Sequence, residues 1–188
     1  IVDIEAVIKY FVVHTFVCND DSYTGSMVHN YYLYEENGQL SMIPWDYNLA
    51  FGTYALGMTD PIKDPNILIN YPINTPAEGE VMLNRPLYHN LMKHDEYFAR
   101  YHSYFDELLS EYFESGRFEA ILRKVEKLIA PYVQKDPTAF CSFDDHQLAV
   151  DTLERVCLHR AQSIRGQLDG EIPATSRGQQ ENPGAKVD

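Results

Sequence analysis

Several features that would restrict the function of this chain are scarce or missing in its sequence. No run of about 18 apolar residues occurs, which excludes a transmembrane helix. The three cysteines, Cys18, Cys141 and Cys157, form no CxxC pair, and their odd number predicts at least one free thiol and no disulfide framework. The glycine-rich GxGxxG and GxxxxGK motifs are also missing, so the sequence predicts no phosphate-binding loop of those types.

Positive charge is scarce as well. The 188 residues carry a net charge of -13, which disfavours a nucleic-acid partner and binding to anionic membranes. An acidic domain suits a basic protein substrate, although many acidic surfaces serve only solubility. The hydrophobic content of 45% and the aromatic content of 13% favour one globular domain with a sizeable core.

Hydrophobic spacing of 3.6 residues predicts a mainly helical chain. The expected helices cover Ile1–Cys18, residues 86–112 with Pro86 at the start, Phe118–Tyr132, and a segment after the acid pair Asp144 and Asp145. We read that acid pair as a helix cap. The aromatic residues along these helices are expected in the core, and Leu148 is expected to face inward.

Two segments are expected to be irregular. Residues 57–85 contain four prolines and no clean period, so they predict a long loop, either a lid or a solvated insertion. From residue 166 onward the composition becomes Gly, Pro, Ser, Thr and Gln, so we expect residues 179–188 to be a disordered tail after a domain of residues 1–178.

The centre of the chain carries a β-hairpin signal. Asn37 and Gly38 favour a type I′ turn, with aromatic and β-branched runs on both sides. Paired residue numbers then sum to 75, since 36 lies opposite 39. This register places Asn30 opposite Trp45, and the next residues, His29 and Asp46, opposite each other. The predicted fold class is therefore α+β, with a hairpin that carries polar residues at its open end.

The open end of this hairpin has the chemistry of a hard-metal site. Mg²⁺ prefers oxygen ligands, and one or two carboxylates are typical. Asp46 and Asn30 are the candidate ligands, and Asp21, in a loop just upstream, could accept a proton from a hydroxyl nucleophile. Asp20 is the alternative to Asp21. The order of acid, Asn, strand, turn, strand and acid is also that of the protein-kinase catalytic segment, although the letters HRD and DFG are missing.

Each candidate has a simpler structural interpretation. Asp46 could cap a turn, Asn30 could be an ordinary edge-strand residue, and the loop acids could be merely solvated. Trp45 is expected to pack in the core, and His29, without an identified partner, is expected to be structural. The arginines that could meet a phosphate are expected to form salt bridges on helix surfaces instead; they are Arg85, Arg155, Arg160 and Arg165.

The letters of the hairpin add a resemblance. The run HNYYLYEENGQLSMIPWDYNLAFG resembles the signature of the CotH family, the spore-coat protein H kinases. Members show an N-N-Y-Y-L-Y strand, a glycine-containing turn and an I-P-W-D-x-D/N-x-A-F-G element. NDDSY is similar to the family's N-x-D-G-Y loop, RPLYHNLMKHDEYFARYHSYFDELL to the helices that follow, and SIRGQLDGEIPAT to the C-terminal segment. The resemblance covers the chain from residue 1 to about residue 179.

The resemblance implies an atypical protein-kinase-like fold that transfers the γ-phosphoryl group of ATP to serine residues of proteins with Mg²⁺ or Mn²⁺. Residues 1–178 would be the C-lobe portion. The N-lobe with its phosphate-binding lysine would lie upstream, since the chain opens on IVDIEAVIKYF without an initiator Met. We therefore expect these residues alone to bind ATP weakly and to show little activity. The family implies a location in the spore coat or at the cell surface, and a signal peptide stays open.

The resemblance also implies roles for single residues. Asp46 of the PWD letters would be the metal-binding acid, and Asp21 would be the acid near the nucleophile. Asn30 would contact the metal or a phosphate. Asn48 stands where many members have Asp, which weakens it as a second metal ligand.

Two other function classes stay open. One is a non-catalytic coat or cell-surface interaction module that keeps the same fold. The other is a carbohydrate hydrolase, which would need two carboxylates about 5–10 Å apart across a sugar cleft. The substrate and the oligomeric state are not determined by the sequence.

Overall fold

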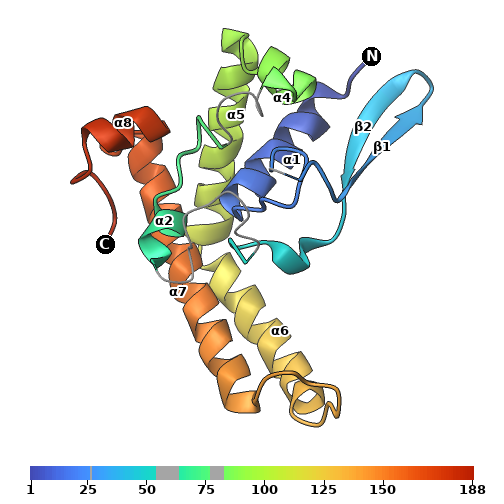
Figure 1. Cartoon of the computed structure of the whole chain (residues 1–188), viewed down its shortest axis with the longest axis vertical. Coiled ribbons are helices and arrows are strands. Elements are labelled where there is room, and N and C mark those ends of the chain that lie inside the picture. Colours follow the sequence, from blue (N-terminus) through green and yellow to red (C-terminus); the bar gives the residue numbers. More distant parts are fainter. Residues whose placement is uncertain (26, 54–63, 77–82) are drawn as a thin grey trace.

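The computed structural model describes residues 1–25, 27–53, 64–76 and 83–188. The molecule is mainly helical and carries one antiparallel β-hairpin, which is compatible with the predicted α+β class (Figure 1). Among the described residues no helix is long and apolar enough to cross a membrane. All three cysteines are free thiols, as expected, with Cys18 and Cys157 buried and Cys141 exposed.

Helix α1 (Ile4–Phe16) lies at the centre of the core. The Asp3 side chain begins it by accepting a hydrogen bond from the Ala6 N–H at 3.0 Å, which satisfies one of the free donors of the first turn. The helix packs on α5 (Asp95–Leu108) and on strand β2 (Gln39–Pro44). Fully buried residues of both helices, including Phe11 and Phe105, form this core, so the expected helix 1–18 and its aromatic partners are confirmed.

The hairpin has the predicted register. Strand β1 (Tyr31–Glu36) pairs with β2 (Gln39–Pro44), with Tyr31 opposite Pro44 and Glu36 opposite Gln39. Asn37 and Gly38 take positive φ angles of 54° and 79°, as a type I′ turn requires. The N-terminal residues add a parallel bridge between Val2 and Leu40 on the outer edge of β2.

Trp45 corrects one expectation about the hairpin. It is 56% exposed and touches Tyr32 edge-on, with ring centroids 5.7 Å apart, so it does not pack in the core. Tyr32, Leu33, Tyr34 and Ile43 are also exposed. The hairpin projects from the body of the molecule (Figure 1), which leaves apolar side chains on both of its faces uncovered.

The C-terminal half is built of helices that follow the predicted pattern with interruptions. The region 86–112 is divided into α4 (Pro86–Leu91) and α5, and a single π-helical turn, η2 (Leu109–Phe113), continues α5. The longest helix is α7 (Phe143–Leu168), and its cap is Ser142 in a capping box with Asp145. The acid pair therefore does help to begin this helix.

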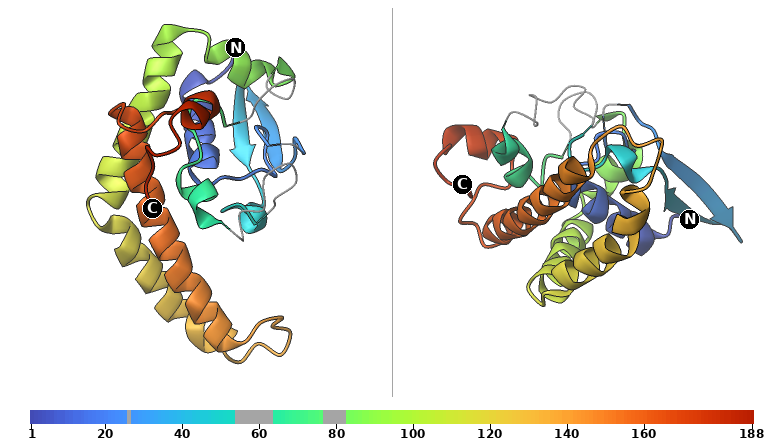
Figure 2. Two further views of the ribbon diagram at one scale, coloured as in Figure 1. Left: turned by 60° about the vertical axis from the view of Figure 1, so that its left-hand side comes forward. Right: turned by 90° about the horizontal axis from the view of Figure 1, so that it is seen from below.

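Helix α6 (Arg117–Val133) and the first half of α7 form an arm that extends away from the core (Figures 1 and 2). The predicted apolar stripe of α6 is present but not buried: Leu128 is 68% exposed and Tyr132 is 75% exposed. Leu148 on α7 is also exposed, contrary to expectation. The periodicity identified the helices, but it did not show which part of each helix is buried in the core.

Short segments depart from the irregular structure that composition predicts. Helix α2 (Pro65–Ile69) interrupts the expected loop of residues 57–85, and residues 57–63 and 77–82 of that loop lie outside the described residues. Helix α8 (Ser176–Glu181) continues into the segment expected to be disordered. Val187 there exchanges two hydrogen bonds with the Asn70 side chain, at 2.8 and 2.9 Å, so the structure instead attaches this segment to the end of α2.

Arg160 is a further correction. It is 2% exposed, and its guanidinium donates to four backbone carbonyls at the ends of α1 and α2, those of Thr15, Phe16, Ile69 and Tyr71. It therefore joins α7 to both segments instead of forming a surface ion pair. Arg165 fits the expectation, since it pairs with Asp106 at 2.6 Å and with Glu114 at 2.9 Å on the surface.

Candidate functional site

The loop of residues 19–25 leaves the C-terminal end of α1 and is buried along most of its length. Cys18, with a positive φ of 45°, turns the chain out of the helix. The Asn19 side chain then accepts a hydrogen bond from the Asp21 N–H at 3.2 Å, and the Ser22 hydroxyl donates to the Asn19 carbonyl at 2.7 Å. These short-range bonds define the path of the loop before any distant residue contributes.

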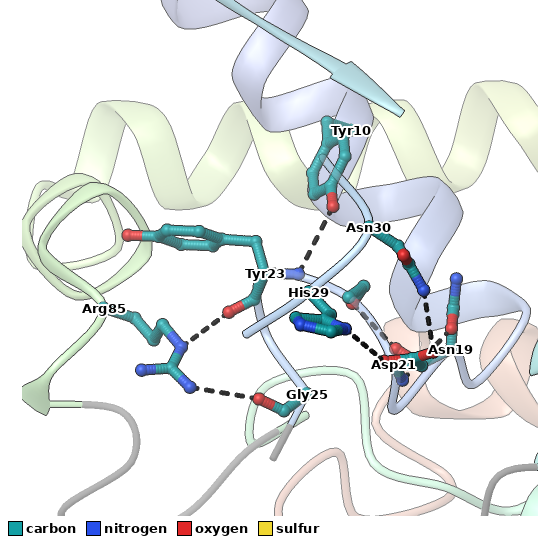
Figure 3. A network of polar contacts seen from close by, with 9 residues as sticks. Tyr10, Asn19, Asp21, Tyr23, Gly25, His29, Asn30 and Arg85 are labelled. Atoms are coloured by element: carbon teal, nitrogen blue, oxygen red, sulfur yellow. Dashed lines mark hydrogen bonds and ion pairs between the residues drawn. The ribbon is translucent and has the colours of Figure 1, made fainter. Parts of the chain in front are cut away.

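Asp21 is the centre of the polar network in this loop (Figure 3). Its side chain is only 10% exposed. The Asn30 Nδ2 donates to the Asp21 Oδ2 at 2.7 Å, which brings the two predicted site residues together. The Asn30 amide is thereby oriented with its Nδ2 toward Asp21, and its Oδ1 is available as an oxygen ligand.

His29 is a member of this site that the sequence did not reveal. The expectation was a structural residue without a partner, but its Nδ1 lies 3.8 Å from the Asp21 Oδ1, and its side chain is 65% exposed. A protonated His29 would therefore form an ion pair with Asp21 at the solvent edge. Its position next to Asn30 in the HNYYLY run was the available signal.

Arg85 fixes the far side of the loop. It is 6% exposed, and its guanidinium donates to the carbonyls of Tyr23 at 2.6 Å and Gly25 at 3.1 Å (Figure 3). The Tyr23 hydroxyl in turn accepts the Leu87 N–H at 3.1 Å, at the start of α4. Arg85 is therefore a buried anchor of the loop and not a surface salt-bridge residue. Because its partners are 60 and 62 residues away, local sequence patterns could not predict this role.

The second candidate acid lies in a different environment. The last hydrogen bond of the hairpin joins the Trp45 N–H to the Asn30 carbonyl at 3.1 Å, as the register predicts. Asp46 then takes a positive φ of 53°, and the chain enters a short 3₁₀ helix, η1 (Tyr47–Leu49). The Asp46 side chain makes no capping hydrogen bond, so the interpretation of Asp46 as a turn cap is wrong.

Asp46 and Asn48 are both exposed. No hydrogen bond or ion pair joins either side chain to Asp21 or Asn30 in the described part of the chain. The predicted pairing of His29 with Asp46 is likewise not part of the ladder, which ends at Tyr31 and Pro44. Asp46 therefore directly follows Trp45, the residue paired with Asn30, and its side chain is exposed to solvent.

The donors that surround the hairpin mouth fit a hard cation in type. Asp46 offers a carboxylate, and Asn30 and Asn48 offer amide oxygens, which are the ligands that Mg²⁺ and Mn²⁺ prefer. Across residues 1–25, 27–53, 64–76 and 83–188, no group of three or more His, Cys, Asp and Glu side chains is arranged to hold a metal ion. The metal role of these three residues remains a prediction.

A buried histidine lies beneath both acid-bearing segments. His14 of α1 is 1% exposed, and burial lowers the pKa of its imidazole to about 4. Its Nδ1 lies 2.9 Å from the Tyr10 carbonyl, which can only accept a hydrogen bond, so Nδ1 carries the proton. Burial also raises the pKa of the Tyr10 phenol, which stays protonated at neutral pH.

The comparison with known families finds one match. The family model described as CotH kinase protein matches residues 1–164 of the chain. The chain belongs to the CotH family. No curated protein and no solved structure matches it. As a CotH protein it is a kinase-like member of a family associated with the spore coat, and the matched region includes all four predicted site residues, Asp21, Asn30, Asp46 and Asn48.

Proposed function

We propose that this CotH chain carries the catalytic-loop half of a protein kinase that transfers the γ-phosphoryl group of ATP to serine hydroxyls of proteins. The observation that supports the proposal best is the 2.7 Å hydrogen bond from Asn30 to the buried Asp21, at the mouth of a hairpin that delivers Asp46. A protein kinase needs a positioned base beside oxygen ligands for a metal, and these residues supply both kinds of group.

In this proposal Asp21 is the base. The serine oxygen forms a bond to the γ-phosphorus, the bond from that phosphorus to the ADP oxygen breaks, and the serine proton passes to the Asp21 carboxylate. Asn30 holds Asp21 in place through Nδ2. Asp46, the Asn30 Oδ1 and Asn48 would hold Mg²⁺ or Mn²⁺, which when bound neutralises charge on the phosphates.

Charge supports a protein substrate of basic character. The chain has a net charge of -13, and no Lys or Arg occurs between Lys9 and Lys63, a stretch that includes Asp21, Asn30, Asp46 and Asn48. Acidic surroundings favour an approaching basic segment over an acidic one. We propose basic, serine-rich proteins of a spore coat or cell surface as the substrate class.

One observation favours a second candidate, a non-catalytic interaction module with the same fold. The hairpin exposes Tyr32, Ile43 and Trp45 together, and exposed apolar patches are typical of protein–protein contact. The chain also contains no glycine-rich nucleotide loop. In this case Asp21 would be a structural acid, and Asp46 would have no role in transfer.

The two candidates differ in a phosphotransfer assay. The full natural protein that contains these residues is incubated with γ-labelled ATP, Mg²⁺ or Mn²⁺, and a basic serine-rich protein, and the 188-residue chain is assayed beside it. We expect label transfer from the full protein that falls at least about 100-fold in Asp21→Asn and in Asp46→Asn. The exposed acid Asp144 on the arm provides the matched control, Asp144→Asn. Transfer that survives either site variant, or no transfer by a folded full protein, would support the interaction module.

A further inference from the structure

His14 has a position that the proposed function does not use. It is fully buried in helix α1, whose buried residues are mostly apolar. Its Nε2 is buried and has no hydrogen-bond partner among the described residues. A histidine in such a place costs stability relative to an apolar ring, because an unpaired buried nitrogen loses its contact with water.

The imidazole lies between two tyrosine rings. It stacks on Tyr10 with ring centroids 3.8 Å apart and an interplanar angle of 24°. On Tyr47 the centroids are 5.0 Å apart and the angle is 32°. Aromatic ring pairs add stability beyond the area that they bury, so we expect His14 to restrain the spacing of the two tyrosines.

Each tyrosine leads to one of the two candidate acids. The Tyr10 hydroxyl accepts a hydrogen bond from the Tyr23 N–H at 3.4 Å, within the loop that carries Asp21 (Figure 3). Tyr47 directly follows Asp46 and begins η1, where its carbonyl accepts the Ala50 N–H at 3.0 Å. The ring of His14 thus contacts Tyr47 directly and is connected to the Asp21 loop through Tyr10.

Backbone hydrogen bonds hold the two ends of the Asp46 turn. The Trp45 N–H donates to the Asn30 carbonyl at the entry, and the Phe51 N–H donates to the Val17 carbonyl at 2.6 Å at the exit. Between these points Asp46 is exposed and has a strained backbone. Within the turn, the Tyr47 ring contacts His14, and Ala50 is buried.

We infer that His14 is a positioning residue that couples the turn of Asp46 to the loop of Asp21 through the stack Tyr10–His14–Tyr47. The stack sets where the metal-binding acid lies relative to the base. The inference rests on the proposed roles of the two acids, but the coupling itself exists or fails independently of phosphoryl transfer.

The decisive experiment changes a residue in the Asp46 turn and measures amide hydrogen exchange in the Asp21 loop. Tyr47→Ala removes the outer ring of the stack at a half-exposed site, so the protein should still fold. We expect the Tyr23 N–H, on the Asp21 side, to exchange about tenfold faster in this variant, and Tyr47→Phe to leave it within about twofold of the wild type. The Ala6 N–H, bonded to Asp3 at the far end of α1, is the control amide.

His14 itself is tested in the same way. His14→Ala should accelerate exchange of both the Tyr23 and the Ala50 N–H groups, while His14→Phe, which keeps a ring in the stack, should leave both close to the wild type. Acceleration of the Ala50 N–H alone in Tyr47→Ala, with the Tyr23 N–H unchanged, would overturn the inference. The Tyr47 pair decides the question even if His14→Ala does not fold.

A second readout separates this inference from the proposed function. Trp45, the single tryptophan, precedes Asp46, so added MnCl₂ that binds at Asp46 should quench its fluorescence. We expect Mn²⁺ to bind about tenfold more weakly to His14→Ala than to the wild type, and equally to His14→Phe. Absence of quenching in the wild type would contradict the proposed metal site, and the exchange data would then decide the coupling alone. Equal Mn²⁺ binding by wild type and His14→Ala would count against the inference.

Discussion

The Asp21 loop and the Asp46 turn place their acidic side chains in opposite environments. Asp21 is 10% exposed, bonded to Asn30, and lies in a loop tied down by Arg85. Asp46 is exposed and makes no capping bond. In the proposed function, protein contacts orient the carboxylate of Asp21 as a base requires, whereas the backbone contacts of the turn place Asp46 and leave its carboxylate exposed.

The difference extends to the backbone. Four non-glycine residues at the hairpin mouth have positive φ angles: Val28, Asn30, Asp46 and Phe51. Such angles cost about 1–2 kcal/mol per residue, and Val28 is β-branched, which makes its angle more unusual. Strain of this kind clusters at binding and catalytic sites. The mouth is thus held in an unfavourable conformation by a well-anchored loop on one side.

Removal of Arg85 should release the Asp21 loop, so that it is no longer held more firmly than the Asp46 turn. Of the changes considered, this one should lower the free energy of unfolding the most. Arg85→Met leaves the Tyr23 and Gly25 carbonyls without their charged donor in a buried place, so we expect a loss of about 3–4 kcal/mol in the free energy of unfolding. The matched control is Arg165→Met, which breaks two surface ion pairs and should cost about 1 kcal/mol or less. Urea denaturation measures both. Similar losses in the two variants would show that Arg85 is no more than a surface contact.

Lower pH should weaken both regions together, because His14 contacts Tyr47 directly and the Asp21 loop through Tyr10. Its pKa falls from 6.5 in the unfolded chain to about 4 in the folded protein. Between these values the unfolded chain binds the extra proton, so the contribution is complete above about pH 6.5 and is lost as the pH falls to 4. At 1.36 kcal/mol per pKa unit the loss is about 3 kcal/mol.

The matched variant for this effect is His14→Phe, which has no group to titrate. Its stability should vary less between pH 7 and pH 4 than that of the wild type, by about the same 3 kcal/mol, in urea denaturation at each pH. Parallel pH profiles for the two proteins would mean that His14 does not titrate in this range.

The sequence predicted those parts of the site that depend on local rules. The Asn37 and Gly38 turn sets the hairpin register, and the register alone places Asn30 opposite Trp45. Distant contacts were not predictable in this way. Arg85 bonds carbonyls 60 and 62 residues away, and Arg160 bonds carbonyls 89 to 145 residues away. A sequence pattern shows a charge, and only the packed structure shows whether that charge is buried.

The prediction that Trp45 and the apolar stripe of α6 are buried failed for a related reason. Trp45 and the stripe of α6 have the apolar letters of a core, yet Trp45 is 56% exposed and Leu128 is 68% exposed. Periodicity reports which side of an element is apolar, but it does not report whether another element lies there. The tail shows the converse case, since polar letters that predict disorder are ordered by the Asn70 side chain.

The smallest expected effect is also the sharpest test of the comparison. Asp46 has a φ of 53°, which glycine adopts without strain. Relief of this backbone strain is expected to outweigh the entropy that glycine adds to the unfolded chain. Asp46→Gly should therefore raise the free energy of unfolding by a net amount of about 0.5–1 kcal/mol. The same change at Asp21 should lower it by about 1–2 kcal/mol, because it removes the acceptor for Asn30.

If the free energy of unfolding rises in Asp46→Gly and falls in Asp21→Gly, then Asp46 lowers the stability of the protein, whereas Asp21 contributes to it. Thermal unfolding is sensitive enough, since 1 kcal/mol corresponds to about 2–4 °C for a chain of this size. The stabilised Asp46→Gly protein should at the same time lose Mn²⁺ quenching of Trp45. A loss of stability in Asp46→Gly would contradict the comparison, because a structural role for the Asp46 carboxylate would then explain its presence without any metal.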